Sequence, residues 1–195
     1  MILVRLLAAA LVAAAIPGVA LAQDARRGAE LAAPCAQCHG ANGRSQTPTI
    51  PSLAGQPADF ITVQMILLRE GIRHAPVMNP FAANLPDRDI EDLAAYFATL
   101  PPGPPEDRRS RDAALFAAGQ ALTGPRHCAT CHVSDYGGRN QIPRVAAQRE
   151  EYLVHAMTQY RDGLRSGPDT QMNGAVMGLS DADLAALAHY LSQRD

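Results

Sequence analysis

The sequence predicts an all-α protein that consists of two tandem domains related by internal duplication. Helical patterns recur in the same order in the two halves of the chain. No stretch shows the alternating apolar pattern, bounded by turn residues, that is typical of a β-strand. A proline-rich segment lies between the halves and cannot continue a helix. Together these observations favour two small helical domains.

Residues 1–22 have the features of a cleavable signal peptide. Arg5 precedes an apolar run at 6–16, and the segment ends in the small-x-small sequence Ala20-Leu21-Ala22, which is typical of a cleavage site. A membrane anchor is the alternative, but Pro17-Gly18 interrupts the run, which is short for a bilayer span of about 20 residues. We therefore expect export to the periplasm of a protein that is soluble or loosely associated with the membrane.

The first half has three helical patterns, at 25–33, 60–71 and 85–96. The middle pattern ends at Gly71, and helices commonly stop at glycine. Acidic residues near Asp87 suit the positive amino end of the final helix. The sequence therefore predicts three helices in this half.

The second half repeats the first. Its helical patterns fall at 112–123, 152–163 and 179–190, the last of which overlays 85–96 without a gap. The segment Ile-Pro-Ser-Leu-Ala-Gly-Gln at 50–56 matches Ile-Pro-Arg-Val-Ala-Ala-Gln at 142–148. Such agreement over several segments indicates an internal duplication.

The linker between the copies begins with Pro-Pro-Gly-Pro-Pro and continues with charged residues. Such a segment neither forms a helix nor buries itself. The predicted boundaries are a first domain at 23–100, a linker at 101–111 and a second domain at 112–195. Each domain has about 80 residues, a size at which an apolar core alone gives limited stability.

The charge balance excludes one class of partner. The chain has 17 basic residues, all of them arginine, against 19 acidic residues, for a net charge of −2. This slightly negative balance gives no electrostatic basis for binding nucleic acid.

The four cysteines occur in two copies of the pattern C-x-x-C-H, at 35–39 and 128–132. In an exported protein four cysteines would normally suggest two disulfides. This spacing instead favours c-type haem attachment, in which two thiols add across the haem vinyl groups and the histidine binds iron. A bare C-x-x-C pair would leave thioredoxin-like chemistry or a zinc site open, and disulfides or zinc remain the minor alternatives.

The prediction is two covalently bound haem c groups. One is attached through Cys35 and Cys38 with His39 on the iron. The other is attached through Cys128 and Cys131 with His132 on the iron.

The exported chain with tandem C-x-x-C-H domains and Leu-Ala-Gly-Gln at 53–56 resembles the cytochrome c4 family. The similar starts of the final helices, at 85–96 and 179–190, add to the resemblance. It implies two class I cytochrome c folds with His/Met-ligated haems that carry electrons in the periplasm. In the second copy Ala147 replaces Gly55, so we expect the role of this glycine not to be shared.

The resemblance also implies a helix crossing in each domain. An early and a late helix would cross at a small residue, with Gly28 against Tyr96 or Phe97 in the first domain. The second domain would place Gly119 against Tyr190.

The sixth iron ligand is predicted to be a methionine. An electron carrier needs both faces of its iron closed, and a soft thioether favours the ferrous state. In the first domain Met78 is the methionine on a predicted loop, whereas Met65 lies within a helical pattern and is assigned to the core.

The repeat selects the methionine of the second domain. Met78 precedes Leu85 by the same spacing as Met172 precedes Leu179, and an asparagine follows each of the two methionines. The segment 170–178 is expected to be a loop because of its glycines. Met172 is the predicted ligand, and Met177 is assigned to packing.

Two prolines are candidates for orienting the histidines. A ligating histidine usually donates its other ring N–H to a carbonyl, and the resemblance implies the carbonyls of Pro51 and Pro143 as acceptors. Simple turn residues are the alternative. The remaining histidines are assigned surface or packing roles, and the aligned pair Gln56 and Gln148 receives no role from the sequence.

The predicted function is electron transfer and not catalysis. The upstream partner would be a quinol-oxidising complex or a dehydrogenase, and the downstream partner a terminal oxidase. A dihaem subunit of a periplasmic dehydrogenase, such as flavocytochrome c sulfide dehydrogenase, is the alternative. An enzyme with an exposed haem is disfavoured because both irons have a methionine candidate.

Overall fold

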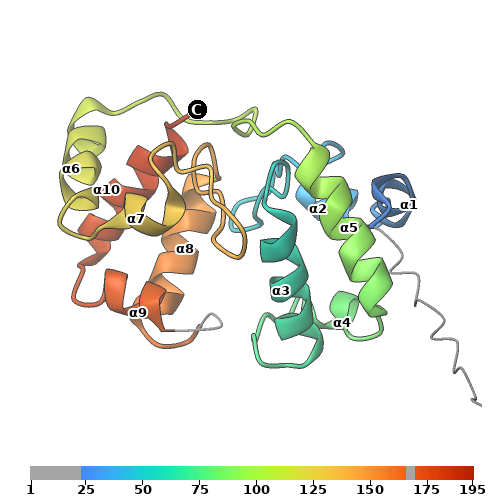
Figure 1. Cartoon of the computed structure of the whole chain (residues 1–195). Helices are drawn as coiled ribbons and strands as arrows, with labels where there is room; N and C mark the ends of the chain where they lie inside the picture. The colour runs from blue at the N-terminus through green and yellow to red at the C-terminus, as the bar shows by residue number, and fades with distance from the viewer. Residues whose placement is uncertain (1–22, 166–169) are drawn as a thin grey trace, which may run out of the picture.

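The computed structural model describes residues 23–165 and 170–195 (Figure 1). The signal peptide predicted at 1–22 lies outside these residues. Within them the regular structure is helical, and β-pairing is limited to one isolated bridge between Arg139 and Ile142. The predicted all-α class is confirmed. The helices of the first half are α1 (Ala25–Leu31), α2 (Ala36–His39), α3 (Ala58–Arg69), α4 (Asn79–Ala82) and α5 (Asp87–Thr99). Those of the second half are α6 (Ala113–Thr123), α7 (Cys128–His132), α8 (Glu150–Arg161), α9 (Gln171–Val176) and α10 (Asp181–Ser192).

Each half encloses its own hydrophobic core. In the first, Ile61 of α3 packs with Leu93 and Phe97 of α5. In the second, Leu153 of α8 packs with Leu184 and Leu187 of α10. Figure 1 shows the two lobes side by side, with the connecting segment running along one edge. None of the helices in the described part of the chain is long and apolar enough to cross a membrane.

The amino ends of the helices follow their sequence signals. Asp24 and Asp112 cap α1 and α6 by accepting backbone N–H groups of the first turn. Ser180 and Asp183 form a reciprocal capping box at the start of α10. Asp87 is the first residue of α5 and lies in its first turn. These local interactions fix where the outer helices of each half begin.

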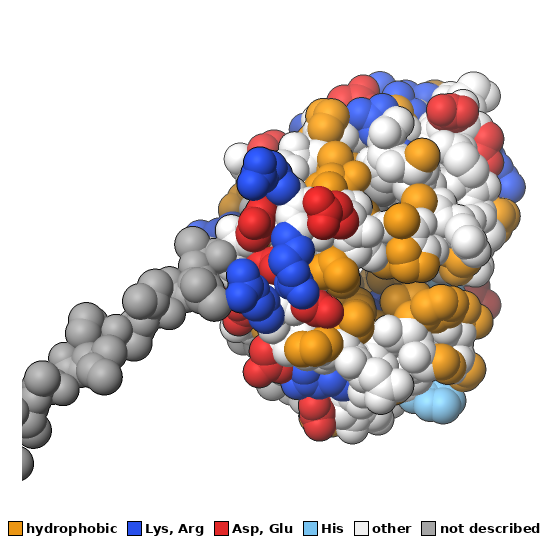
Figure 2. Space-filling view, turned by 90° about the vertical axis from the view of Figure 1, so that its right-hand side faces the viewer, with side chains coloured by type: hydrophobic (Ala, Val, Ile, Leu, Met, Phe, Trp, Pro, Cys, Tyr) orange, Lys and Arg blue, Asp and Glu red, His pale blue; other side chains and the backbone are white. Residues whose placement is uncertain are grey.

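Helix α1 is held to α5 by charged side chains that lie together on one face of the molecule (Figure 2). Arg27 forms ion pairs with Asp89 and Asp92. Asp92 also accepts the backbone N–H of Asp24, and this bond together with Arg27 lowers the pKa of its buried carboxyl. The network ties the first helix to the last helix of the same half.

The expected helix crossings at glycine are confirmed. A methyl group on Gly28 would lie 1.9 Å from the carbonyl oxygen of Asp92 and 2.8 Å from Tyr96 Cβ. On Gly119 it would lie 2.1 Å from the carbonyl oxygen of Ala186 and 2.7 Å from Tyr190 Cβ. Only glycine allows the two backbones of each pair to approach this closely.

Replacing Gly119 by alanine is expected to destabilise the second half by about 3 kcal/mol, because α6 must move away from α10. The measurement is chemical denaturation of the haem-loaded protein. Gly124→Ala is the matched control, since Gly124 has right-handed backbone angles and no neighbouring atom within 4 Å of the added methyl. A loss in the control as large as in Gly119→Ala would contradict this explanation.

The prediction of a loop at 170–178 is wrong, because residues Gln171–Val176 form the short helix α9. Val176 is buried in the second core, and Asn173 donates two hydrogen bonds to backbone carbonyls. These contacts outweigh the helix cost of Gly174, which is at most about 1 kcal/mol. Gly178 follows the helix with φ +75°, a conformation that favours glycine.

The expectation that Ala147 does not share the role of Gly55 is only partly right. Both residues have positive φ angles, +67° for Gly55 and +56° for Ala147. Both donate a backbone N–H to the last helix of their half, at Phe97 and Leu191 respectively. At Gly55 the linker also excludes a side chain, because a methyl group there would lie 2.7 Å from Pro102.

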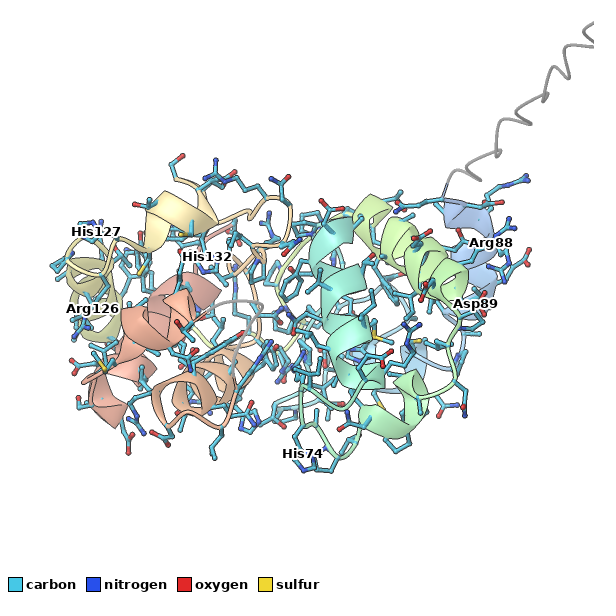
Figure 3. The ribbon with its side chains drawn as sticks, turned by 60° about the horizontal axis from the view of Figure 1, so that its bottom comes forward. His74, Arg88, Asp89, Arg126, His127 and His132 are labelled. Atoms are coloured by element: carbon cyan, nitrogen blue, oxygen red, sulfur yellow. The ribbon has the colours of Figure 1, made fainter. Side chains whose placement is uncertain are left out.

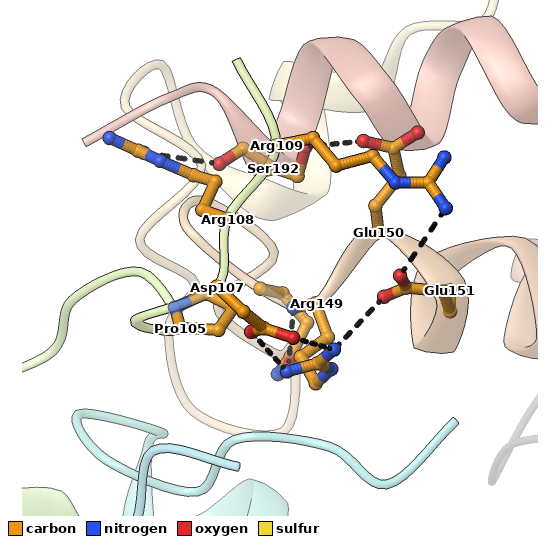
Figure 4. Close-up of a pocket in the computed structure, with 9 residues that line it drawn as sticks. Pro105, Asp107, Arg108, Arg109, Arg149, Glu150, Glu151 and Ser192 are labelled. Atoms are coloured by element: carbon orange, nitrogen blue, oxygen red, sulfur yellow. Dashed lines mark hydrogen bonds and ion pairs between the residues drawn. The ribbon is translucent and has the colours of Figure 1, made fainter. Parts of the chain in front are cut away.

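The connecting segment is fastened to the second half by Arg149 (Figure 4). This buried guanidinium forms a two-pronged ion pair with Asp107, at 2.8 and 3.0 Å. It also donates to the carbonyl of Ser45 in the first half. Arg149 lowers the pKa of the Asp107 carboxyl through these hydrogen bonds. One side chain therefore joins the two halves and the segment between them.

Candidate haem sites

The first C-x-x-C-H motif consists of Cys35 and the short helix α2 that follows it, and the second motif forms the short helix α7. Cys35 and Cys128 pack against the hydrophobic cores of their halves, and burial raises the pKa of both thiols. A reactive thioredoxin-like cysteine has the opposite shift. All four thiols are free, and the described residues contain no cluster of three side chains suited to a metal ion. The disulfide and zinc alternatives therefore gain no support.

The motif histidines are held in matching geometries. The Nδ1 atom of His39 lies 2.8 Å from the carbonyl oxygen of Pro51, and that of His132 lies 2.8 Å from the carbonyl oxygen of Pro143. Because a carbonyl only accepts, each Nδ1 carries the proton and Nε2 is left with its lone pair. Burial lowers the pKa of both rings, opposed in part by the proline carbonyls. Neutral imidazole is the form that binds iron.

Figure 3 shows where the histidines lie in the two halves. His132 is in the interior of its half, whereas His74 and His127 lie at the outer edges. His74, His127 and His155 are exposed. His189 is buried, accepts the backbone N–H of Asp112 and donates to Glu150. Its ring connects α10 to the starts of α6 and α8, in agreement with the expected packing role.

Met78 and Met172 lie at the starts of equivalent short helices. Met78 is the residue before α4, and Met172 lies in the first turn of α9 and packs against the second core. Both side chains are half-buried. Met65 packs against the first core, as expected. The packing role expected for Met177 is wrong, because this residue is 68% exposed.

An asparagine after each methionine holds its short helix in place, a role that the sequence did not reveal. Asn79 donates to the carbonyls of Leu68 and Arg73, at 2.7 and 2.9 Å. Asn173 donates to the equivalent carbonyls of Tyr160 and Arg165, at 2.7 and 2.8 Å. The two methionines are thereby fixed in the same position relative to α3 and α8. The only sign of this role in the sequence is that an asparagine follows the methionine in both repeats.

Two arginines from equivalent positions meet between the halves. Arg73 and Arg165 both donate to Oε1 of Gln64, at 2.8 and 3.1 Å. Arg165 also donates to the hydroxyl of Tyr152, and its buried Nε atom has no partner. Within residues 23–165 and 170–195, neither guanidinium forms an ion pair with a carboxylate. The alignment of the repeats pairs these arginines, but nothing in the sequence indicates that they meet.

The charge of this arginine pair acts on neighbouring groups. Although burial raises the pKa of Tyr152, Arg165 and Arg73 outweigh burial and lower it to about 8. Burial lowers the pKa of Arg73. A buried charge with no opposite charge beside it costs several kcal/mol. Because the described residues place no carboxylate on this pair, the site favours an anionic group.

The residues present fit two haem groups. Each half offers two free thiols, one neutral imidazole with its Nε2 lone pair available, and one methionine at an equivalent position. The paired arginines fit the carboxylates that haem carries at one edge. The donor set is the one expected for covalent haem with two axial ligands.

Comparisons with known proteins agree with this donor set. The family model described as cytochrome c matches residues 25–101 and again 116–195. Cytochrome c4 from Thiocapsa roseopersicina is 36% identical over 165 residues, which cover 80% of this chain and 85% of the relative. A thiosulfate dehydrogenase electron acceptor from Stutzerimonas stutzeri is 31% identical, covering 81% of this chain and 77% of the relative. The crystal structure of reduced cytochrome c4 from Pseudomonas stutzeri superposes with a TM-score of 0.82 at 29% identity, covering 89% of this chain and all of the other.

Proposed function

The chain belongs to the cytochrome c4 family of dihaem cytochromes c, and from this premise we propose that it carries single electrons through a periplasmic respiratory chain. It has two tandem cytochrome c domains, binds two haem c groups covalently and transfers electrons rather than catalysing a reaction. The observation that carries the proposal is the duplicated donor set, with one thiol pair, one oriented imidazole and one methionine in each domain.

The proposed ligand assignment follows the repeat. Cys35 and Cys38 hold the first haem, with His39 and Met78 on its iron. Cys128 and Cys131 hold the second haem, with His132 and Met172 on its iron. When bound, the haem iron supplies reversible one-electron oxidation and reduction.

The protein contributes ligand orientation and electrostatics. The carbonyls of Pro51 and Pro143 fix the imidazole planes and make the rings better donors. Asn79 and Asn173 hold the methionine segments in place. Arg73 and Arg165 supply positive charge where the domains meet.

The proposed first domain spans 23–100, the linker 101–111 and the second domain 112–195. Residues 1–22 would direct export to the periplasm. The two family-model matches, at 25–101 and 116–195, fall close to these boundaries. The two separate hydrophobic cores support the same division.

A terminal oxidase is the proposed downstream partner, and a quinol-oxidising complex or a dehydrogenase is the proposed donor. The similarity to a thiosulfate dehydrogenase electron acceptor makes a thiosulfate-oxidising enzyme the second candidate donor.

The test is expression of the full chain in a bacterium that matures c-type cytochromes. We expect two haems per chain that resist acid extraction, reversible reduction of both, and oxidation of the reduced protein by membranes that contain a terminal oxidase. The double variant Cys128→Ala, Cys131→Ala should retain one haem. Extractable haem would contradict the covalent attachment, and reduction by thiosulfate with its dehydrogenase would identify the donor class.

A further inference from the structure

Two glutamines join the domains by reciprocal hydrogen bonds. Gln148 of the second domain accepts the backbone N–H of Ser52 at 2.7 Å and donates to the Ser52 carbonyl at 2.9 Å. Gln56 of the first domain makes the same two contacts with Arg144, at 3.0 and 2.9 Å. Both glutamines are buried, with 4% of their surface exposed. The two sets of contacts are made by equivalent residues of the repeat, since Gln56 aligns with Gln148 and Ser52 with Arg144.

Each glutamine contacts the peptide group that orients a motif histidine. The N–H of Ser52 belongs to the same amide as the carbonyl of Pro51, which accepts from His39. The N–H of Arg144 belongs to the same amide as the carbonyl of Pro143, which accepts from His132. A chain of hydrogen bonds therefore runs from the glutamine of one domain, through a single amide, to the histidine of the other.

Hydrogen bonds in such a chain strengthen one another. An amide whose N–H is donated becomes more polarised, and its carbonyl becomes a stronger acceptor by about 10–30%. A stronger acceptor at Nδ1 makes the imidazole a better electron donor through Nε2. Better donation favours ferric over ferrous iron, so each glutamine stabilises the oxidised haem of the opposite domain.

We propose that Gln148 and Gln56 are positioning residues that couple the domains, with Gln148 tuning the haem ligated by His39 and Gln56 tuning the haem ligated by His132. This inference rests on the axial ligation proposed above. It gives the interface a role in setting reduction potentials. The histidine ligand of each haem receives the effect of the glutamine only while the two domains are docked.

The test is a redox titration of the haem-loaded full chain, followed by NMR so that each haem is observed separately. The signals of the first haem are assigned with Met78→Ala. Gln148→Leu is expected to raise the equilibrium constant for reducing the His39 haem about two- to fivefold, which is the size of a partial loss of one hydrogen bond. The His132 haem should stay unchanged. Gln56→Leu should give the reverse pattern, and it is the second variant if Gln148→Leu does not fold.

A second readout separates tuning from general loosening. In the ferrous protein the Nδ1–H signal of His39 should shift in Gln148→Leu and not in Gln56→Leu. The matched control is Asp107→Ala, which breaks the ion pair with Arg149 at the same junction without touching either amide. Equal changes at both haems, a change at the haem of the glutamine's own domain, or no change would overturn the inference. A parent protein without two His/Met-ligated haems would instead contradict the proposed function.

Discussion

Replacing Met78 by alanine is expected to remove about half of the weak long-wavelength absorption band that reports iron–thioether bonding in the ferric protein. Met172→Ala should remove the other half. The reason is that each methionine supplies the soft sixth ligand of one iron, and its loss also lowers the reduction potential of that haem. The measurement is the optical spectrum of the oxidised protein, with a redox titration of each variant.

Met177→Ala is the matched control, because Met177 lies five residues after Met172 and is 68% exposed. Its removal should leave the band intact. If Met177→Ala removed half of the band and Met172→Ala did not, the register taken from the repeat would be wrong. The equivalent hydrogen bonds of Asn79 and Asn173 make that result unexpected, since they place Met78 and Met172 alike.

The parts of the site that depend on local sequence could be predicted. The C-x-x-C-H spacing fixes two thiols and an imidazole on one helical turn, so the pattern alone indicates the chemistry. The repeat then selected Met172 over Met177, because the same interval to the final helix recurs in both halves. The glycine crossings at Gly28 and Gly119 followed from the family resemblance and are confirmed.

What the sequence did not reveal arises where the domains meet. These residues form two aligned pairs, Gln56 with Gln148 and Arg73 with Arg165. Three of them contact the opposite domain directly, at sequence separations of 88 or more. The fourth, Arg73, contacts Gln64, which in turn accepts from Arg165 of the other domain. Local patterns do not specify how two domains dock. The helix α9 was missed for a related reason, since burial of Val176 outweighs the helix cost of Gly174.

Replacing Arg165 by methionine is expected to lower the reduction potential of the haem groups. Arg165 is buried beside Arg73, and neither has a carboxylate partner in the described residues. Positive charge near a haem favours ferrous iron, so its removal favours ferric iron. Two unit charges about 15 Å apart at an effective dielectric constant of about 20 interact by roughly 1 kcal/mol, or about 40 mV for one electron. The expected shift is of this order.

Arg161→Met is the control that tests whether burial causes the effect. Arg161 lies four residues earlier and already forms ion pairs with Asp162 and Asp181, two exposed carboxylates. Water and salt screen such a surface cluster, so the potentials should change little. Added salt should not cancel the shift in Arg165→Met, because the guanidinium is shielded from solvent. Potentials that rise or stay constant in Arg165→Met would show that the arginine pair does not face the haem carboxylates.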